Sequence, residues 1–317
     1  MSDQAFASTN DVVEQKASIV ELGPNVYGYI SESDPNCGFV VGDDAVLVVD
    51  TRATPALARD LLEAIGSITD KPVKFVFLTH YHAVRVLGAA AFANAAIFSS
   101  VGTRNLICER GAADYESEVR RFPRLFKGVD EIPGLTLPHV TFERELGFWL
   151  SGRELRFMHL GRGHSAGDAV CWLPDCGVLF AGDLVENGCA VYTGDAYMRD
   201  WTQTLECLRD LRAQVMVPGR GAVLSGRQQV SGAIDSTKDF ILTLLGAVQR
   251  GLHEGGDLKA CYRVAEEVMT PRFGEWPVYK HALAFDVARA YDELRGMQHP
   301  QIWTAARDAD LWARLHG

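Results

Sequence analysis

The sequence predicts an α/β fold in which β-sheets are sandwiched between helices. Short apolar runs rich in β-branched and aromatic residues, such as 45–50 and 73–78, are typical of buried strands. Segments with helical periodicity, such as 54–66, alternate with these runs in two similar halves of the chain. Interleaved strands and helices of this kind favour stacked sheets with helices on the outside.

The first half contributes most of the predicted strands and one well-marked helix. Thr54 is a good N-cap and Pro55 suits the first helical position. Leucine and isoleucine recur with helical spacing from 57 to 65, so one face of this helix should pack on a sheet. Shorter helical patterns follow at 88–94 and 102–128. Strands are expected near 18–22, 26–31, 37–41, 45–50 and 73–78.

The second half repeats this alternation. Between its last two strands, Asp200 is expected to cap a helix whose Trp201 and Leu205 lie on one apolar face. Cys171 and Cys176 flank a turn that should join two strands into a hairpin. The strands are expected near 153–159, 169–174, 178–182 and 214–217.

From about residue 230 the pattern changes to helices alone. Apolar residues with helical spacing mark three of them, around 234–248, 264–268 and 282–291. Because no turn-rich linker precedes them, we expect a main domain over 17–229 and a helical extension over 230–317 packed on it. Such an extension can shape a substrate pocket or a homodimer contact. His281 is its one candidate site residue, against the simpler interpretation of a packing histidine.

Composition excludes several classes of protein. The 317 residues are 47% apolar, enough for a sizeable core, and 31 basic against 41 acidic residues give a net charge of −10. No broad basic field for nucleic acid is therefore expected, and the basic run at 120–124 is interpreted as a solvated loop or helix end. No segment is apolar enough for a membrane span, and residues 1–10 lack the features of a secretion signal, so the cytoplasm is expected. The seven cysteines are expected to be reduced thiols, and only Cys37 is a weak candidate for the site mouth.

The most informative segment is Thr79-His80-Tyr81-His82 at the end of the 73–78 strand. Two histidines at positions i and i+2 just beyond a strand can direct both imidazoles at one point. Neutral imidazole is the commonest ligand for zinc and also serves iron. The segment therefore predicts a metal site, whereas Tyr81, on the opposite side, should pack.

This segment resembles the start of the Thr-His-x-His-x-Asp-His signature of the metallo-β-lactamase superfamily, and four further segments resemble that family in the same order. They are the strand ending at Asp50, the segment 163–168 around His164, the strand ending at Asp183, and Val217-Pro218-Gly219-Arg220-Gly221, where the family has Pro-Gly-His-Gly. The resemblance covers roughly residues 17 to 225 and implies the αββα sandwich, with a metal cleft along one sheet edge.

The resemblance also implies the ligands. His80, His82 and His164 match the three histidines of the family's first metal, and Asp183 matches the bridging carboxylate. The residues of the second metal are all replaced, because the chain has Val84, Arg85 and Arg220 at their positions. A guanidinium is charged at any working pH and cannot ligate a metal, so we expect no two-metal site. Asp50 and Thr79 match supporting positions, while Asp168 and His159 are interpreted as structural.

Three functions remain open on these residues. The first is a mononuclear hydrolase with one zinc per chain, in which the metal-bound water is the nucleophile with its pKa lowered to about 7. Asp183 would ligate the metal or accept the proton of the water, and Arg85 and Arg220 would bind an anionic group or stabilise an oxyanion. The substrate would be a small ester, thioester, lactone or amide.

The second is a mononuclear iron oxygenase, in which His80, His164 and Asp183 form a two-histidine, one-carboxylate face. The third is a metal-free or metal-poor binding protein, in which Arg85 or Arg220 pairs directly with Asp183 and fills the cleft. No nucleotide cofactor is expected, because Gly161-Arg162-Gly163 lacks the spacing of a phosphate-binding loop.

Overall fold

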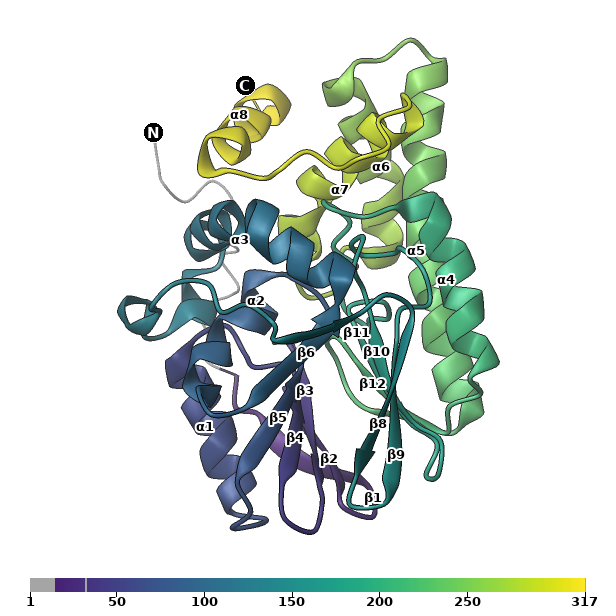
Figure 1. The fold of residues 1–317 in the computed structure, drawn as a ribbon. Coiled ribbons are helices and arrows are strands. Elements are labelled where there is room, and N and C mark those ends of the chain that lie inside the picture. Colours follow the sequence, from purple (N-terminus) through teal and green to yellow (C-terminus); the bar gives the residue numbers. More distant parts are fainter. Residues whose placement is uncertain (1–14, 32, 317) are drawn as a thin grey trace.

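The computed structural model describes residues 15–31 and 33–316 and has the predicted αββα architecture. Two sheets face each other, with helix α1 (Pro55–Gly66) outside the first sheet and helices α4 (Met198–Asp210) and α5 (Arg227–His253) outside the second (Figure 1). Residues 1–10, for which no secretion signal was predicted, lie outside the described part of the chain.

The first sheet has seven strands in the order of the sequence. The strands as far as β4 pair antiparallel, and β4 to β7 pair parallel. A parallel crossover puts the carboxyl ends of consecutive strands at one edge of the sheet. The strands are β1 (Ser18–Gly23), β2 (Val26–Ile30), β3 (Cys37–Val41), β4 (Val46–Val49), β5 (Val73–Phe77), β6 (Ala96–Ser100) and β7 (Val140–Phe142).

The second sheet has six strands in the order β13-β12-β11-β10-β9-β8. Only β11 and β12 pair parallel, with α4 as the crossover between them. The hairpin predicted between Cys171 and Cys176 joins β10 to β11. The strands are β8 (Glu145–Leu150), β9 (Arg153–Met158), β10 (Val170–Leu173), β11 (Val178–Gly182), β12 (Val215–Pro218) and β13 (Leu224–Ser225).

Apolar side chains fill three layers. The middle layer lies between the sheets, where the rings of Phe77 and Phe157 stack with centroids 4.3 Å apart. A second layer packs α1 on the first sheet through Leu61 and Ile65. The third packs α4 on the second sheet through Trp201, which is fully buried.

The predicted start of α1 is confirmed and that of α4 is corrected. The hydroxyl of Thr54 accepts the Leu57 amide, with Pro55 at the first helical position. Asp200 does not cap α4, because it lies inside the first turn and pairs with Arg162. The Glu293 carboxylate instead accepts the first free amides of α4, at 3.0 and 3.1 Å, from a helix distant in sequence. Such a cap cannot be read from local sequence.

The C-terminal helices share the third apolar layer with the second sheet. Helix α5 contacts β12, β13 and α4. The last helix, α8, was not predicted from the sequence, and it packs on α3, α6 and α7. This part of the chain contains α5, α6 (Leu258–Phe273), α7 (Tyr279–Leu294) and α8 (Ala305–His316).

The segment after β5 forms the short helix α2 and a 3₁₀ turn, followed by the long helix α3. Helix α3 ends at Arg121, so the basic run at 120–124 is a helix end as predicted. It is not solvated throughout, because Arg121 is buried with its guanidinium carbon 4.5 Å from the Phe285 ring centroid, and Arg124 pairs with Asp34. The bounds are α2 (Ala83–Val86), η1 (Leu87–Phe92), α3 (Val101–Arg121), η2 (Pro123–Phe126) and η3 (Val129–Glu131).

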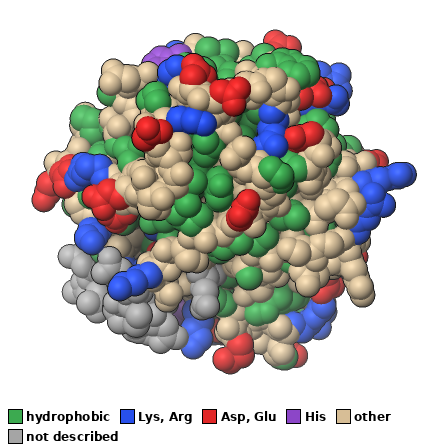
Figure 2. Space-filling view, turned by 90° about the horizontal axis from the view of Figure 1, so that it is seen from below, with side chains coloured by type: hydrophobic (Ala, Val, Ile, Leu, Met, Phe, Trp, Pro, Cys, Tyr) green, Lys and Arg blue, Asp and Glu red, His purple; other side chains and the backbone are tan. Residues whose placement is uncertain are grey.

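One face of the molecule shows how the charged side chains are distributed. On the face shown in Figure 2, basic and acidic side chains of the described residues are interspersed with apolar ones, and neither sign forms a single field. Among the helices of residues 15–31 and 33–316, none combines the length and the apolar character needed to cross a membrane. No disulfide joins any of the seven cysteines, all of which lie in the described part of the chain.

Candidate metal centre

The site residues lie beyond the carboxyl ends of strands from both sheets. Asp50 follows β4, His80 and His82 follow β5, Asp183 follows β11, and Arg220 follows β12. His164 lies in the loop between β9 and β10. The sheets are joined here by the Ala169 amide, which donates to the Thr79 carbonyl at 2.8 Å.

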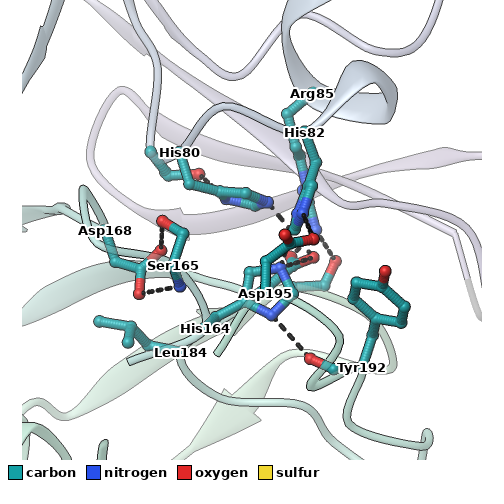
Figure 3. A network of polar contacts seen from close by, with 12 residues as sticks. His80, His82, Arg85, His164, Ser165, Asp168, Leu184, Tyr192 and Asp195 are labelled. Carbon is teal, nitrogen blue, oxygen red and sulfur yellow. Dashed lines mark hydrogen bonds and ion pairs between the residues drawn. The ribbon is translucent and has the colours of Figure 1, made fainter. Parts of the chain in front are cut away.

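The three histidines converge. One ring nitrogen from each of His80, His82 and His164 lies within 4.8 Å of the others, and Figure 3 shows the rings turned toward one another. The Asp183 Oδ2 atom lies 3.6 Å from the Nε2 atoms of both His80 and His164. His80 Nε2 is buried without a hydrogen-bond partner among the described residues. The sequence prediction that these four residues come together thus matches their placement.

The outer nitrogen of each ring is held by a different group. Thr79 Oγ1 lies 3.0 Å from His80 Nδ1, Asp195 Oδ2 lies 3.3 Å from His82 Nε2, and the Tyr192 carbonyl oxygen lies 2.9 Å from His164 Nδ1 (Figure 3). Metal-ligating histidines usually have such an outer partner, which fixes the tautomer and the ring orientation. With its inward nitrogens and outward supports, the donor set fits a single zinc or iron ion.

Asp195 is a site residue that the sequence analysis missed. Its Oδ1 atom accepts from Arg110 at 3.2 Å while Oδ2 faces His82, so its carboxylate is fixed from two sides. Asp195 follows Gly194 in a loop after β11 that carries no recognised motif. Only the folding of that loop against α3 brings it to the histidines.

Arg85 lies where a second cation would be expected. Its guanidinium donates to the Asp183 carboxylate, to the Asn36 carbonyl, and to the Gly219 carbonyl at 2.8 Å. Asp50 Oδ2 lies 3.5 Å from Arg85 Nη1. Because Arg85 is 1% exposed and surrounded by these partners, this placement does not support its predicted contact with a substrate anion. Its positive charge balances two buried carboxylates instead.

Arg220 lies on the other side of Asp183. Its Nη1 atom is 3.3 Å from Asp183 Oδ2 and 3.1 Å from Glu186 Oε1. Glu186, which the sequence analysis also missed, accepts the Arg220 backbone amide as well. The position of Gly219 is sterically fixed, because a Cβ atom there would overlap the Asp183 carboxylate.

The electrostatics differ among the three histidines. Burial lowers the pKa of His164 to about 3 and that of His80 well below its usual value, so both are neutral. Burial also opposes the charge of His82, but the carboxylates of Asp114 and Asp195 outweigh it and raise the pKa of His82 to about 9. His82 Nδ1 lies 2.8 Å from His164 Nε2, so a protonated His82 donates to its neutral neighbour. A metal at this point would displace that proton.

The pKa of Asp183 is held well below its usual range. Burial alone would raise it, but Arg85, His80 and Arg220 together lower it. Asp183 is therefore an anion at any physiological pH, although its two oxygens already face two guanidinium groups. The pairing of Asp183 with arginine that the metal-free interpretation predicted is present, together with the histidine cluster that the metal-dependent interpretations predicted.

Several supporting residues lie as predicted. Asp50 accepts the Thr79 amide at 2.9 Å and its hydroxyl at 2.8 Å, which fixes the strand end before His80. Asp168 accepts the Ser165 amide and hydroxyl and so closes the His164 loop. Tyr81 packs in the apolar layer of the first sheet. His281 packs against Phe122 with ring centroids 3.8 Å apart, as expected of a packing histidine.

Cys37 is buried, and burial raises the pKa of its thiol to about 11, so it is not a reactive group at the site mouth. His159, also interpreted as structural, has Nδ1 2.7 Å from the Asp168 carbonyl oxygen.

A group of polar atoms beside the histidines has no hydrogen-bond partner in the described part of the chain, although Arg121 lies within ion-pair distance of Glu118 and Asp308. It comprises the Tyr192 hydroxyl, Oε2 of Glu118, and Nε and Nη2 of Arg121. The Tyr192 ring lies 5.7 Å from the His82 ring and 6.0 Å from the His164 ring, centroid to centroid. Buried polar groups without partners carry a large desolvation cost, so these atoms indicate where a polar ligand or water would bind.

The fold and the centre together define an αββα protein with a three-histidine metal site at the end of its sheets. Comparison with known proteins agrees, because the family model described as metallo-beta-lactamase superfamily matches residues 31–220. The chain belongs to that superfamily, as a divergent member whose second metal site is incomplete.

Two curated relatives illustrate the range of the family. The chain is 24% identical to a linear primary-alkylsulfatase from Pseudomonas sp. (strain ATCC 19151) over 247 residues, 67% of this chain but only 46% of the relative. It is 29% identical to a metallo-beta-lactamase type 2 from Bacillus sp. (strain 170) over 218 residues, 65% of this chain and 77% of the relative. The chain thus spans less than half of the alkylsulfatase.

The similar solved structures also include both metallo-beta-lactamases and an alkyl sulfatase. A metallo-beta-lactamase from Pontibacter korlensis matches with a TM-score of 0.58 and 21% identity over 71% of this chain and 99% of its own. A double mutant of the sec-alkyl sulfatase PisA1 matches with a TM-score of 0.69 and 17% identity over 93% of this chain and 52% of its own. A match over 93% of the chain must extend into the C-terminal helices, so the fold of the sulfatase includes a counterpart for part of that region.

Proposed function

We propose that this chain is a mononuclear metal-dependent hydrolase of small acidic esters, with zinc held by His80, His82 and His164. The orientation of the three imidazole rings carries the proposal. One nitrogen of each ring faces a common point, and the other nitrogen of each ring has a fixed partner. Such pre-orientation costs conformational entropy and is typical of metal ligands. When bound, zinc supplies a Lewis acid and activates a water for attack.

Arg85 takes over the electrostatic part of the missing second metal. Its guanidinium lowers the pKa of Asp183 and opposes the burial that raises the pKa of Asp50 to about 6. It also holds Asp183 beside His80 and His164. Asp183 is therefore positioned to ligate the metal or to accept a proton from the attacking water. A fixed guanidinium cannot leave or exchange, which favours one metal per chain.

The unpartnered polar atoms next to the histidines are suited to bind the substrate. The Tyr192 hydroxyl and the Nη2 atom of Arg121 are hydrogen-bond donors, and their targets would be the oxygens of the ester group. Arg121 is held rigidly, because its guanidinium lies against the ring of Phe285 and 3.8 Å from Asp308. Donors fixed before the substrate arrives stabilise developing negative charge without reorganisation.

The substrate class is taken from the relatives and from the charges around the site. An alkylsulfatase is among the relatives, and Arg220, beside Asp183, lines a neighbouring pocket, so acidic esters such as sulfate esters are the first class to test. Thioesters, lactones and amides, including β-lactams, follow. The cytoplasmic location, the homodimer contact and the absence of nucleic-acid and membrane partners remain predictions from the sequence, and so does the division at residue 230.

Metal content and hydrolysis, measured on the same preparation, test the proposal. We expect about one zinc per chain by elemental analysis, lost in the His80→Ala, His164→Ala double variant together with sulfate-ester hydrolysis. The matched control is His253→Ala, an exposed histidine at the end of α5, which should retain both. Iron instead of zinc would support oxygen chemistry on His80, His164 and Asp183. No metal after incubation with zinc would refute the hydrolase.

The second candidate is a metal-free binding protein. The direct pairing of Asp183 with Arg85 and Arg220 favours it, because both oxygens of the expected bridging carboxylate already have cationic partners. On this hypothesis His82 stays protonated and donates to His164, and the cleft binds its ligand without cleaving it. Ligand binding that is unchanged by zinc, with no turnover, would support this function.

A further inference from the structure

A pocket of about 320 Å³ opens beside Arg220, between the end of α3 and the connection from α6 to α7. The α3 side contributes Phe122 and Arg124, and the connection contributes Trp276, Tyr279 and Lys280. A volume of this size is at the lower end of the range for small-molecule sites. Half of its wall therefore belongs to the C-terminal helical region, for which no motif predicted a role.

The pocket is adjacent to the metal centre through Arg220. This residue lines the pocket, and its Nη1 atom is 3.3 Å from Asp183 Oδ2. The same Asp183 oxygen is 3.6 Å from the Nε2 atoms of His80 and His164. Two residues, Arg220 and Asp183, thus connect the pocket to the histidines.

The charge of the pocket is mainly positive. Arg124, Arg220 and Lys280 line it, with Glu275 as an opposing carboxylate. Arg124 pairs with Asp34, and Arg220 pairs with Asp183 and Glu186. Lys280 is exposed, and within residues 15–31 and 33–316 no hydrogen bond or ion pair of its ammonium group is found. It is therefore the pocket cation that remains available for an incoming anion.

The remaining wall is aromatic and well fixed. The Trp276 ring packs against Phe273 and Phe240, with centroids 4.9 and 6.1 Å apart. The Tyr279 hydroxyl lies 2.9 Å from Thr270 Oγ1, so this ring is held as well. Rigid aromatic surfaces bury apolar ligand area at little entropic cost.

The backbone of this wall is held in an unfavourable conformation. Val278 has φ of 70°, in the left-handed region that β-branched residues rarely adopt. The preceding Pro277 carbonyl accepts the Ala190 amide at 3.0 Å, which ties the connection to the loop after β11. Strained residues persist where the surrounding structure fixes them and cluster at ligand sites. Trp276 and Lys280, two residues to either side of Val278, both line the pocket.

We propose that this pocket binds the substrate as an organic anion, with its apolar body against Trp276 and Tyr279 and its negative charge attracted by Lys280 and Arg220. The proposal rests on the proposed function, because it assigns the substrate class of that same centre. It makes Lys280 and Trp276, both from the helical region, the residues that determine specificity. The shared chemistry is an acidic group on an apolar body, either a sulfate or a carboxylate.

Binding of octyl sulfate, octanoate, octanol and octyltrimethylammonium, measured by titration calorimetry on the full chain with zinc, tests this assignment. We expect the two anions to bind more tightly than the alcohol and the cation. Lys280→Glu should weaken anion binding about five- to tenfold, the size expected for one partly exposed charge pair. Lys280→Arg should restore it, and Trp276→Ala should weaken all apolar ligands. Lys259→Glu, the same charge change on α6 away from the pocket, should have no effect.

The possible results distinguish a failure of the pocket assignment from a failure of the proposed hydrolysis. Equal binding of octanol and octyl sulfate, or an unchanged affinity in Lys280→Glu, would overturn the pocket assignment even if the protein hydrolyses esters. Binding as expected in the His80→Ala, His164→Ala double variant would support the pocket independently of the metal. If that binding is found but the zinc-loaded protein cleaves none of the ester classes, the proposed function fails and the pocket stands. Octanoate binding without octyl sulfate binding would assign the site to carboxylates.

Discussion

Replacing Arg85 by methionine removes the guanidinium that two buried carboxylates share. Arg85 is 1% exposed, pairs with Asp183, lies 3.5 Å from Asp50, and donates to the Gly219 carbonyl at 2.8 Å. Methionine retains most of the volume and none of the charge. The variant therefore isolates the electrostatic role of Arg85 from its packing.

The expected loss of unfolding free energy follows from the burial of Arg85 and its carboxylate partners. Removing one partner of a buried ion pair leaves an uncompensated charge and costs about 3–5 kcal/mol of unfolding free energy. A surface pair supplies the control: Arg59 and Glu131 are 51% and 49% exposed, and Arg59→Met should cost at most about 1 kcal/mol. Both variants replace one ion-paired arginine by methionine, so the difference between their losses of unfolding free energy reports the effect of burying the arginine and its carboxylates.

The assay is urea unfolding followed by circular dichroism, in chelator so that metal binding does not contribute. The pH dependence gives a second test. Without Arg85, the pKa of Asp183 rises above its unfolded value, so stability falls as pH rises through the new pKa. The cost of Arg85→Met should therefore be smaller at about pH 5 than at about pH 8. An excess of divalent cation should recover part of the loss by replacing the missing charge.

An Arg85→Met protein that unfolds within about 1 kcal/mol of the parent at neutral pH would refute this reasoning. A loss of unfolding free energy that does not change with pH would refute it as well. Either result would mean that Asp183 and Asp50 are neutral, or are compensated by Arg220 alone, and that Arg85 does not replace a cation.

Two further predictions concern the histidines. Asp195→Asn keeps the shape of the side chain but removes the charge opposite His82 Nε2. Zinc binding, measured by competition with a chromogenic chelator, should weaken about 10- to 100-fold. An unchanged affinity would exclude Asp195 as the support of that ring. Because the pKa of His82 is raised to about 9, its imidazole is protonated below that pH and must lose the proton to bind a metal. Zinc binding at neutral pH should then release about one proton, and the number of protons released should fall as pH rises past about 9. Calorimetry in buffers of different ionisation enthalpy measures this number. Zero release at neutral pH would show that His82 is already neutral.

Much of the fold was readable from local patterns. The strands from 18 to 78 and the capped helix at 55 were predicted within a residue or two, because their apolar runs and capping residues are local signals. Strands β6, β7, β8 and β13 and helix α8 were missed. Of these, β8 alternates exposed and half-buried side chains on an edge of its sheet, so it lacks the apolar run that marks a buried strand.

The candidate site shows the same division. The matching segments located the three histidines and Asp183, and the structure brings their side chains together. Asp195 and Glu186 were missed, because each acts through a contact with a residue from another strand or loop. The sequence left two roles open for Arg85, binding of a substrate anion and direct pairing with Asp183, and the structure shows the pairing.

The sequence by itself determined the identity and order of the chemical groups. Histidines after the β5 strand, a third before β10 and a carboxylate after β11 can meet at one sheet edge because strand direction and side-chain alternation are properties of the chain. It also determined that two arginines stand at positions of the second metal. Only the tertiary structure decided which of these charges neutralise one another, and that the C-terminal helices supply half of the neighbouring pocket. Burial and distance set the strength of a charge interaction, and both depend on segments that the fold brings together from opposite ends of the chain.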